Sequence, residues 1–106
     1  MRILFDQGTP VPLRRSLAAH EVATAWQRGW AQLSNGDLLA AAEADGFDLL
    51  VTPDQNLRYQ QNLAARRIAM LVLTVANWPT LEPYASGIAT TIDAMHPGEY
   101  REWSPP

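Results

Sequence analysis

Three aspartates, Asp6, Asp37 and Asp54, are the side chains of this sequence best suited to chemistry. The first follows the apolar run 2–5 and the third follows the apolar run 47–52, so each is expected at the carboxyl end of a buried strand. The carboxyl ends of parallel strands share one edge of a sheet, where ligands bind in open α/β folds. Asp37 begins the helix that precedes the second strand, and such a helix starts at that same edge. The spacing therefore predicts that the three carboxylates converge.

Converging carboxylates repel one another, and a divalent cation removes that cost. Ligand sets made only of oxygen atoms favour hard ions, so Mg²⁺ or Mn²⁺ is the expected cofactor. Such an ion lowers the pKa of a bound water and stabilises the charge that builds on phosphorus. The chemistry that these residues favour is metal-dependent hydrolysis of a phosphodiester.

Each acid also has a purely structural interpretation. Asp37 could cap or charge the start of its helix. Asp54 could be a turn residue ahead of a helix that Asn56 caps. Asp6 has no evident capping duty, although an Asx-turn would satisfy it. Together the three acids indicate a site more strongly than any one of them, because two follow strands that are expected to be parallel.

The elements that must position these acids alternate between strand and helix. This order predicts a three-layer α/β/α fold with a mostly parallel sheet of about four to five strands, in a single domain of residues 1–106. The expected strands lie at 2–5, 21–26, 47–52, 68–75 and 99–103. Helices are expected to begin at Thr9 and Pro10, at Ser34 and at Leu81, with a turn at 78–80 and a helix or loop at 56–65.

The composition excludes several classes of protein. The 106 residues include no cysteine, which excludes a disulfide scaffold, a thiolate zinc site and a cysteine nucleophile. No signal peptide or apolar stretch long enough to span a membrane is present, so we expect a cytoplasmic protein without membrane contact. The four tryptophans are expected to be core or interface anchors rather than platforms for stacking bases.

The net charge of the chain is −3, so its overall charge does not indicate binding to nucleic acid. Lysine is absent, however, and arginine binds phosphate through two N–H groups at once. Arg14, Arg15 and Arg58 are therefore candidates for binding a substrate backbone. The alternative is that they are solvated residues at helix ends.

At these residues the sequence resembles the short PIN-like proteins that are predicted to be nucleases and components of toxin–antitoxin systems. Four short motifs carry the resemblance, in an order and spacing that span residues 1 to about 81: ILFDQGTP at 3–10, AHEV at 19–22, SNGDLL at 34–39 and LVTPDQNL at 50–57. The resemblance implies a PIN-like fold and a metal-dependent ribonuclease acting on RNA. It also implies an antitoxin-like protein partner or a homo-oligomer.

The same resemblance carries Asp6, Asp37 and Asp54 over as catalytic residues and metal ligands. Two positions depart from the family pattern, because Gln7 and Asn56 stand where relatives often have acidic residues. Neutral side chains there compensate less of the charge of a metal ion. Asn56 remains a candidate ligand through its carbonyl oxygen.

Two other interpretations stay open. The first is a PIN-like protein with a weak or inactive site that acts through a partner or homodimer, which the replacements at Gln7 and Asn56 favour. The second is a receiver-like module in which Asp54 accepts a phosphoryl group. That second interpretation requires paired acids after the first strand and a later lysine, and this sequence has neither.

Overall fold

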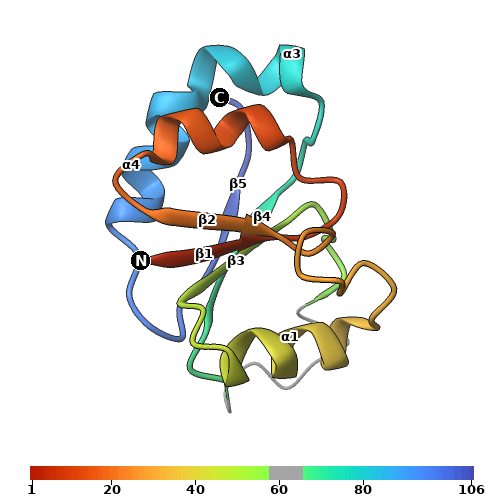
Figure 1. The fold of residues 1–106 in the computed structure, drawn as a ribbon. Coiled ribbons are helices and arrows are strands. Elements are labelled where there is room, and N and C mark those ends of the chain that lie inside the picture. Colours follow the sequence, from red (N-terminus) through yellow and green to blue (C-terminus); the bar gives the residue numbers. More distant parts are fainter. Residues whose placement is uncertain (58–65) are drawn as a thin grey trace.

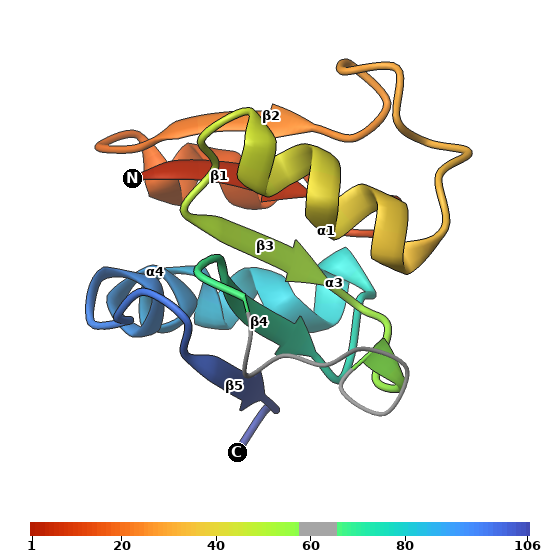
Figure 2. The same cartoon turned by 90° about the horizontal axis from the view of Figure 1, so that it is seen from below.

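The computed structural model describes residues 1–57 and 66–106. At its centre is a five-stranded sheet in which all neighbouring strands are parallel, in the order β2-β1-β3-β4-β5 (Figures 1 and 2). The strands are β1 (Arg2–Phe5), β2 (Glu21–Thr24), β3 (Leu49–Thr52), β4 (Ala69–Leu73) and β5 (Tyr100–Trp103). The expected α/β fold with a parallel sheet is confirmed, and each strand lies within the range that the sequence analysis expected for it.

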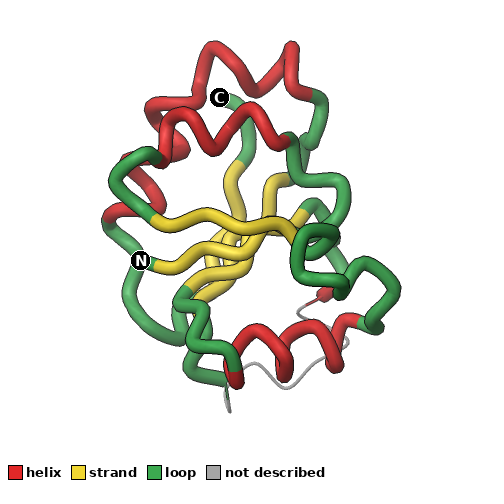
Figure 3. The backbone as a smooth tube through the Cα atoms, viewed as in Figure 1, coloured by secondary structure: helices red, strands yellow, loops and turns green. Residues whose placement is uncertain are grey.

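Helices cover both faces of this sheet (Figure 3). On one face lies α1 (Asn35–Ala44), and the other face is covered by η1 (Val11–Leu17), α3 (Trp78–Leu81), η3 (Glu82–Tyr84) and α4 (Ala85–Asp93) (Figure 1). Within the described ranges, no helix has both the length and the apolar character needed to cross a bilayer.

Three expectations about the helices need correction. The segment 78–80 is the start of α3 rather than a turn, because Asn77 caps it by accepting a hydrogen bond from the N–H of Thr80. The segment expected as one helix from Leu81 is divided into η3 and α4, since Pro83 cannot donate an intrahelical hydrogen bond. The first helix is a 3₁₀ helix without a side-chain cap, because the Thr9 hydroxyl instead donates to the carbonyl of Val51.

The sheet separates two hydrophobic cores. One lies under η1, α3 and α4 and includes Ile3, Phe5, Leu13, Leu17, Leu71, Ile88 and Ile92. The second lies under α1 and includes Leu4, Leu38, Leu39, Leu50, Leu57 and Met70. Successive strand residues alternate between these cores, so strands β3 and β4 are buried throughout.

The chain leaves the adjacent strands β1 and β3 toward opposite faces of the sheet. After β1 it enters η1, whereas Leu57, which follows β3, belongs to the core under α1. Such a topological switch point opens a crevice at the carboxyl edge of the sheet, and ligands bind there in open α/β folds. Asp6 and Asp54 lie on either side of this switch point.

Helix α1 is tied to the segment before β4 through Glu43. Its carboxylate accepts hydrogen bonds from the backbone N–H of Arg67 at 2.9 Å and from Nη1 of Arg66 at 3.0 Å. Burial raises the pKa of Glu43, but these two donors and the two arginine charges outweigh it and hold the pKa below its usual value. A carboxyl group with a lowered pKa stabilises the fold above its unfolded pKa, and this contribution is lost as the pH falls through the folded pKa.

We therefore expect Glu43→Gln to lower the free energy of unfolding at neutral pH by about 1–2 kcal/mol. The variant should also lose less stability than the wild type on acidification, because the titrating carboxylate is gone. Urea unfolding at neutral pH and at about pH 3 measures both effects. Glu82→Gln is the matched control, since Glu82 is exposed and forms no ion pair within the described part of the chain. Equal pH dependence in the two variants would contradict the assignment.

Candidate functional site

A chain of hydrogen bonds joins Asp6 and Asp54 at the carboxyl edge of β1 and β3. Oγ1 of Thr52 donates to Oδ2 of Asp6 at 2.8 Å and accepts the N–H of Asp54 at 3.1 Å. Thr52 is fully buried and is the last residue of β3, so the strand fixes the position of its hydroxyl group. Both carboxylates are half-buried. The structure thus brings two of the predicted residues together through a threonine to which the sequence analysis gave no role.

Further donors orient each carboxylate. Oδ1 of Asp6 accepts the N–H of Gln7 at 2.8 Å. Oδ1 of Asp54 accepts the N–H of Asn56 at 2.9 Å, and its Oδ2 accepts Nδ2 of Asn35 at 2.8 Å. Each carboxylate oxygen can accept more than one hydrogen bond or also bind a cation. The two side chains are therefore held in place and keep the capacity to bind a ligand.

The loop that carries Asp6 is folded tightly against the end of β3. The N–H of Asp6 donates to the carbonyl of Val51 at 2.9 Å, and Oγ1 of Thr9 donates to the same carbonyl, also at 2.9 Å. Gly8 adopts a φ of +91°, and a Cβ at this position would lie 3.1 Å from Cγ of Pro53. The loop therefore needs glycine at this position, both for its backbone conformation and for its contact with Pro53.

Asp37 does not join this pair. It is exposed in the first turn of α1, where its N–H donates to Oγ of Ser34 at 3.3 Å. Within 1–57 and 66–106, no group of three His, Cys, Asp or Glu side chains is placed to hold one metal ion. The expected convergence of three carboxylates is therefore wrong. The residue that α1 presents to Asp54 is Asn35, and Asp37 instead places a negative charge at the positive end of the helix dipole.

The other predicted site residues have different surroundings. Asn56 is exposed and contacts Asp54 through its backbone N–H, so a ligand role for its side chain stays a prediction. Arg14 is half-buried in η1, with Nη2 donating to the carbonyl of Val22 at 3.2 Å, and Arg15 is exposed on the same helix. Arg58 lies outside the described residues.

A cavity of about 420 Å³ opens beside Asp6. It is lined by residues that follow β1, by part of η1 and by the end of β2, among them Gln7, Val11, Arg14, Trp26 and Gln27. Trp26 is 78% exposed, so of the two roles expected for the tryptophans, core or interface anchor, the core role does not apply to it. Its side chain is the clearest candidate binding group that the sequence analysis missed.

A larger cavity, of about 810 Å³, lies at the opposite edge of the sheet, near Met1, Phe47 and Met95. Its walls carry both signs of charge, and Glu43 in it is already bound to Arg66. The two oriented carboxylates at the carboxyl edge make that edge the better candidate for chemistry.

No protein-family model, curated protein or solved structure matches this chain. The resemblance to PIN-like proteins therefore rests on the four sequence motifs alone.

Proposed function

We propose that this chain is a PIN-like, metal-dependent hydrolase of RNA phosphodiester bonds, and that Asp6 and Asp54 hold Mg²⁺ or Mn²⁺. The observation that carries the proposal is the pair of half-buried aspartates at the switch point of a parallel sheet, where the buried hydroxyl of Thr52 joins the carboxylate of Asp6 to the backbone N–H of Asp54. An RNA hydrolase of this kind fits the role of the toxin in a toxin–antitoxin pair.

The donor set fits a hard divalent cation. The groups of Asp6 and Asp54 that can bind a metal are carboxylate oxygens, and the sequence contains no cysteine. Mg²⁺ is commonly held by one or two carboxylates, with waters and substrate phosphates completing its coordination. Two carboxylates are therefore sufficient without Asp37. When bound, such a cation polarises the phosphate and lowers the pKa of a coordinated water.

The residues of the chain itself supply orientation. Thr52 holds Asp6 and the backbone of Asp54, and Asn35 holds the carboxylate of Asp54. Partners of this type fix ligand geometry in metal sites and commonly contribute 10- to 100-fold in metal affinity or activity. Arg14 lies beside Asp6 in the cavity wall, where a guanidinium group can bind a phosphate oxygen.

The test is cleavage of a labelled single-stranded RNA by the purified protein in Mn²⁺. We expect cleavage that stops in EDTA and returns when Mn²⁺ is added in excess. Contaminating nucleases that need no metal would continue to cut in EDTA, so this control separates them from the chain. Cleavage that persists in EDTA, or no cleavage in Mn²⁺, would contradict the proposed activity.

A second candidate is a PIN-like interaction protein with an inactive site, acting through an antitoxin-like partner or a second copy. It is favoured by one observation: all four carboxylate oxygens of Asp6 and Asp54 already accept hydrogen bonds from within the chain. The pair is therefore satisfied without a metal. A wild-type protein that binds no Mn²⁺ and forms a stable complex or dimer would support this second candidate.

A further inference from the structure

Trp26 lines the cavity beside Asp6, and most of its surface is exposed to solvent. It is 78% exposed, although aromatic side chains of this size gain much from burial. The described residues include only four large apolar side chains with substantial exposure, and two of them, Trp26 and Val11, line this cavity. Trp26 and Val11 thus form a small exposed apolar surface beside Asp6, one of the two proposed metal ligands.

The turn that carries Trp26 is fixed by its own hydrogen bonds. The N–H of Thr24 donates to Oε1 of Gln27, and the N–H of Gln27 donates back to Oγ1 of Thr24, both at 3.0 Å. The N–H of Ala25 donates to the carbonyl of Phe5 at 2.8 Å, which ties the turn to β1. These hydrogen bonds, formed by residues on both sides of Trp26, fix the position of its backbone.

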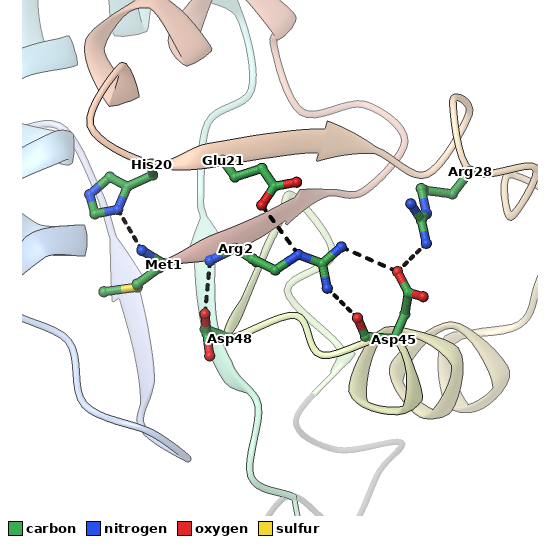
Figure 4. Close-up of polar contacts among 7 residues, drawn as sticks. All are labelled: Met1, Arg2, His20, Glu21, Arg28, Asp45 and Asp48. Atoms are coloured by element: carbon green, nitrogen blue, oxygen red, sulfur yellow. Dashed lines mark hydrogen bonds and ion pairs between the residues drawn. The ribbon is translucent and has the colours of Figure 1, made fainter.

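Arg28 anchors the far end of the same turn (Figure 4). Its guanidinium forms an ion pair with Asp45 and lies over the ring of Trp30, with 5.1 Å between Cζ and the ring centroid. Asp45 also binds Arg2 of β1, at 3.3 Å, and thereby links the turn to the sheet and to the end of α1. The exposed Trp26 therefore lies on a turn whose backbone is held at both ends.

The remaining groups of the cavity complement an unstacked base and its phosphate. Arg14 uses only Nη2 for a contact within the described part of the chain, which leaves further N–H groups of its guanidinium for an anion. Gln7 and Gln27 also line the cavity, and side-chain amides can bond to base edges, although Oε1 of Gln27 already accepts the N–H of Thr24. Aromatic faces bind bases by stacking, and arginine binds the adjoining backbone.

We propose that this cavity is a subsite for one unstacked base of single-stranded RNA, with the base stacked on Trp26 and the adjoining phosphate at Arg14. The inference rests on the proposed function, since it places the bound nucleotide next to Asp6. A protein partner fits less well, because a standard protein interface buries about 800 Å² on each partner, and this cavity presents only two exposed large apolar side chains, Trp26 and Val11. A volume of about 420 Å³ lies within the size range of small-ligand sites.

The test is binding of a fluorescein-labelled single-stranded oligoribonucleotide of mixed sequence, measured by anisotropy in Ca²⁺, with the RNA checked for intactness afterwards. We expect Trp26→Ala to weaken binding by about 5- to 100-fold, because this is the range of base–aromatic stacking. Trp26→Phe should restore most of the affinity. Leu33→Ala, which removes an exposed apolar side chain outside the cavity lining, should bind like the wild type.

The outcomes separate this subsite from the proposed activity. If Trp26→Ala binds RNA as tightly as the wild type while Mn²⁺-dependent cleavage is observed, the subsite is wrong and the activity stands. If binding depends on Trp26 but no cleavage occurs, the subsite stands and the activity is wrong. Wild-type protein that does not bind the oligonucleotide would overturn the subsite. Light scattering that shows a dimer in the wild type and a monomer in Trp26→Ala, with unchanged RNA binding, would assign this surface to a second copy of the chain instead.

Discussion

Asp6→Asn is expected to reduce Mn²⁺-dependent cleavage of RNA by at least about 100-fold. The expectation follows from position, since Asp6 is one of the two carboxylates proposed to hold the cation. Loss of a residue that only orients a metal ligand commonly costs 10- to 100-fold, so loss of a ligand itself should cost at least as much. Initial rates on a labelled single-stranded RNA, at equal concentrations of folded protein, measure the effect.

Asp37→Asn is the matched control for this variant. Asp37 is exposed and contacts Ser34 through its backbone only, so its replacement should leave cleavage within about threefold of the wild type and cost at most about 1 kcal/mol through the helix dipole. A loss of activity in Asp37→Asn equal to that in Asp6→Asn would show that the two carboxylates act together and would contradict the site described above.

Thr52→Val is expected to damage both stability and activity, although valine has nearly the same shape as threonine. The substitution removes the hydroxyl that donates to Asp6 and accepts from the N–H of Asp54 in a fully buried position. Leaving such groups without a partner costs about 1–3 kcal/mol. Because Asp6 also loses a bond that orients it, cleavage should fall by about 10- to 100-fold. Urea unfolding and the same cleavage assay measure the two effects.

Thr90→Val is the control for that substitution. Thr90 is exposed on α4, and its hydroxyl donates to the carbonyl of Ser86 in the same helix. A surface substitution of this kind usually changes stability by no more than about 0.5 kcal/mol. If both threonine variants have wild-type cleavage and stability, Thr52 does not have the role assigned to it.

The centre of the sheet could be predicted because strands β1, β3 and β4 are buried on both faces. Each strand of such a sheet is a short, nearly continuous apolar run, and the runs ending before Asp6 and Asp54 were visible as such in the sequence. The position of these two acids at one edge then follows from parallel topology alone. This is why two of the three predicted acids lie together at this edge.

The prediction for Asp37 was wrong because of the way α1 is rotated about its axis. Asn35 and Asp37 are two residues apart, which is a rotation of about 200° around a helix, so only one of them can face Asp54. The sequence favoured the acid because of its charge, but the start of α1, capped by Ser34, presents Asn35 instead. The rotational setting of a helix against a sheet depends on packing, and a local motif does not determine it.

The end of β2 was placed two residues too late for a different reason. The weak alternation of residues 21–26 suggested a strand that would continue to the tryptophan, yet β2 ends at Thr24. The strand stops because Thr24 and Gln27 bond to each other and form a turn. A side chain at the end of a strand can turn inward or outward, and in this chain the turn directs Trp26 into solvent.

The most direct test of the account is Mn²⁺ binding, measured by the loss of the electron paramagnetic resonance signal of the free aqueous ion. We expect the wild type and Asp37→Asn to bind Mn²⁺ with similar affinity, and Asp6→Asn and Asp54→Asn to bind it at least about tenfold more weakly. Absence of binding by the wild type, or equal binding by all four proteins, would contradict a metal site at Asp6 and Asp54.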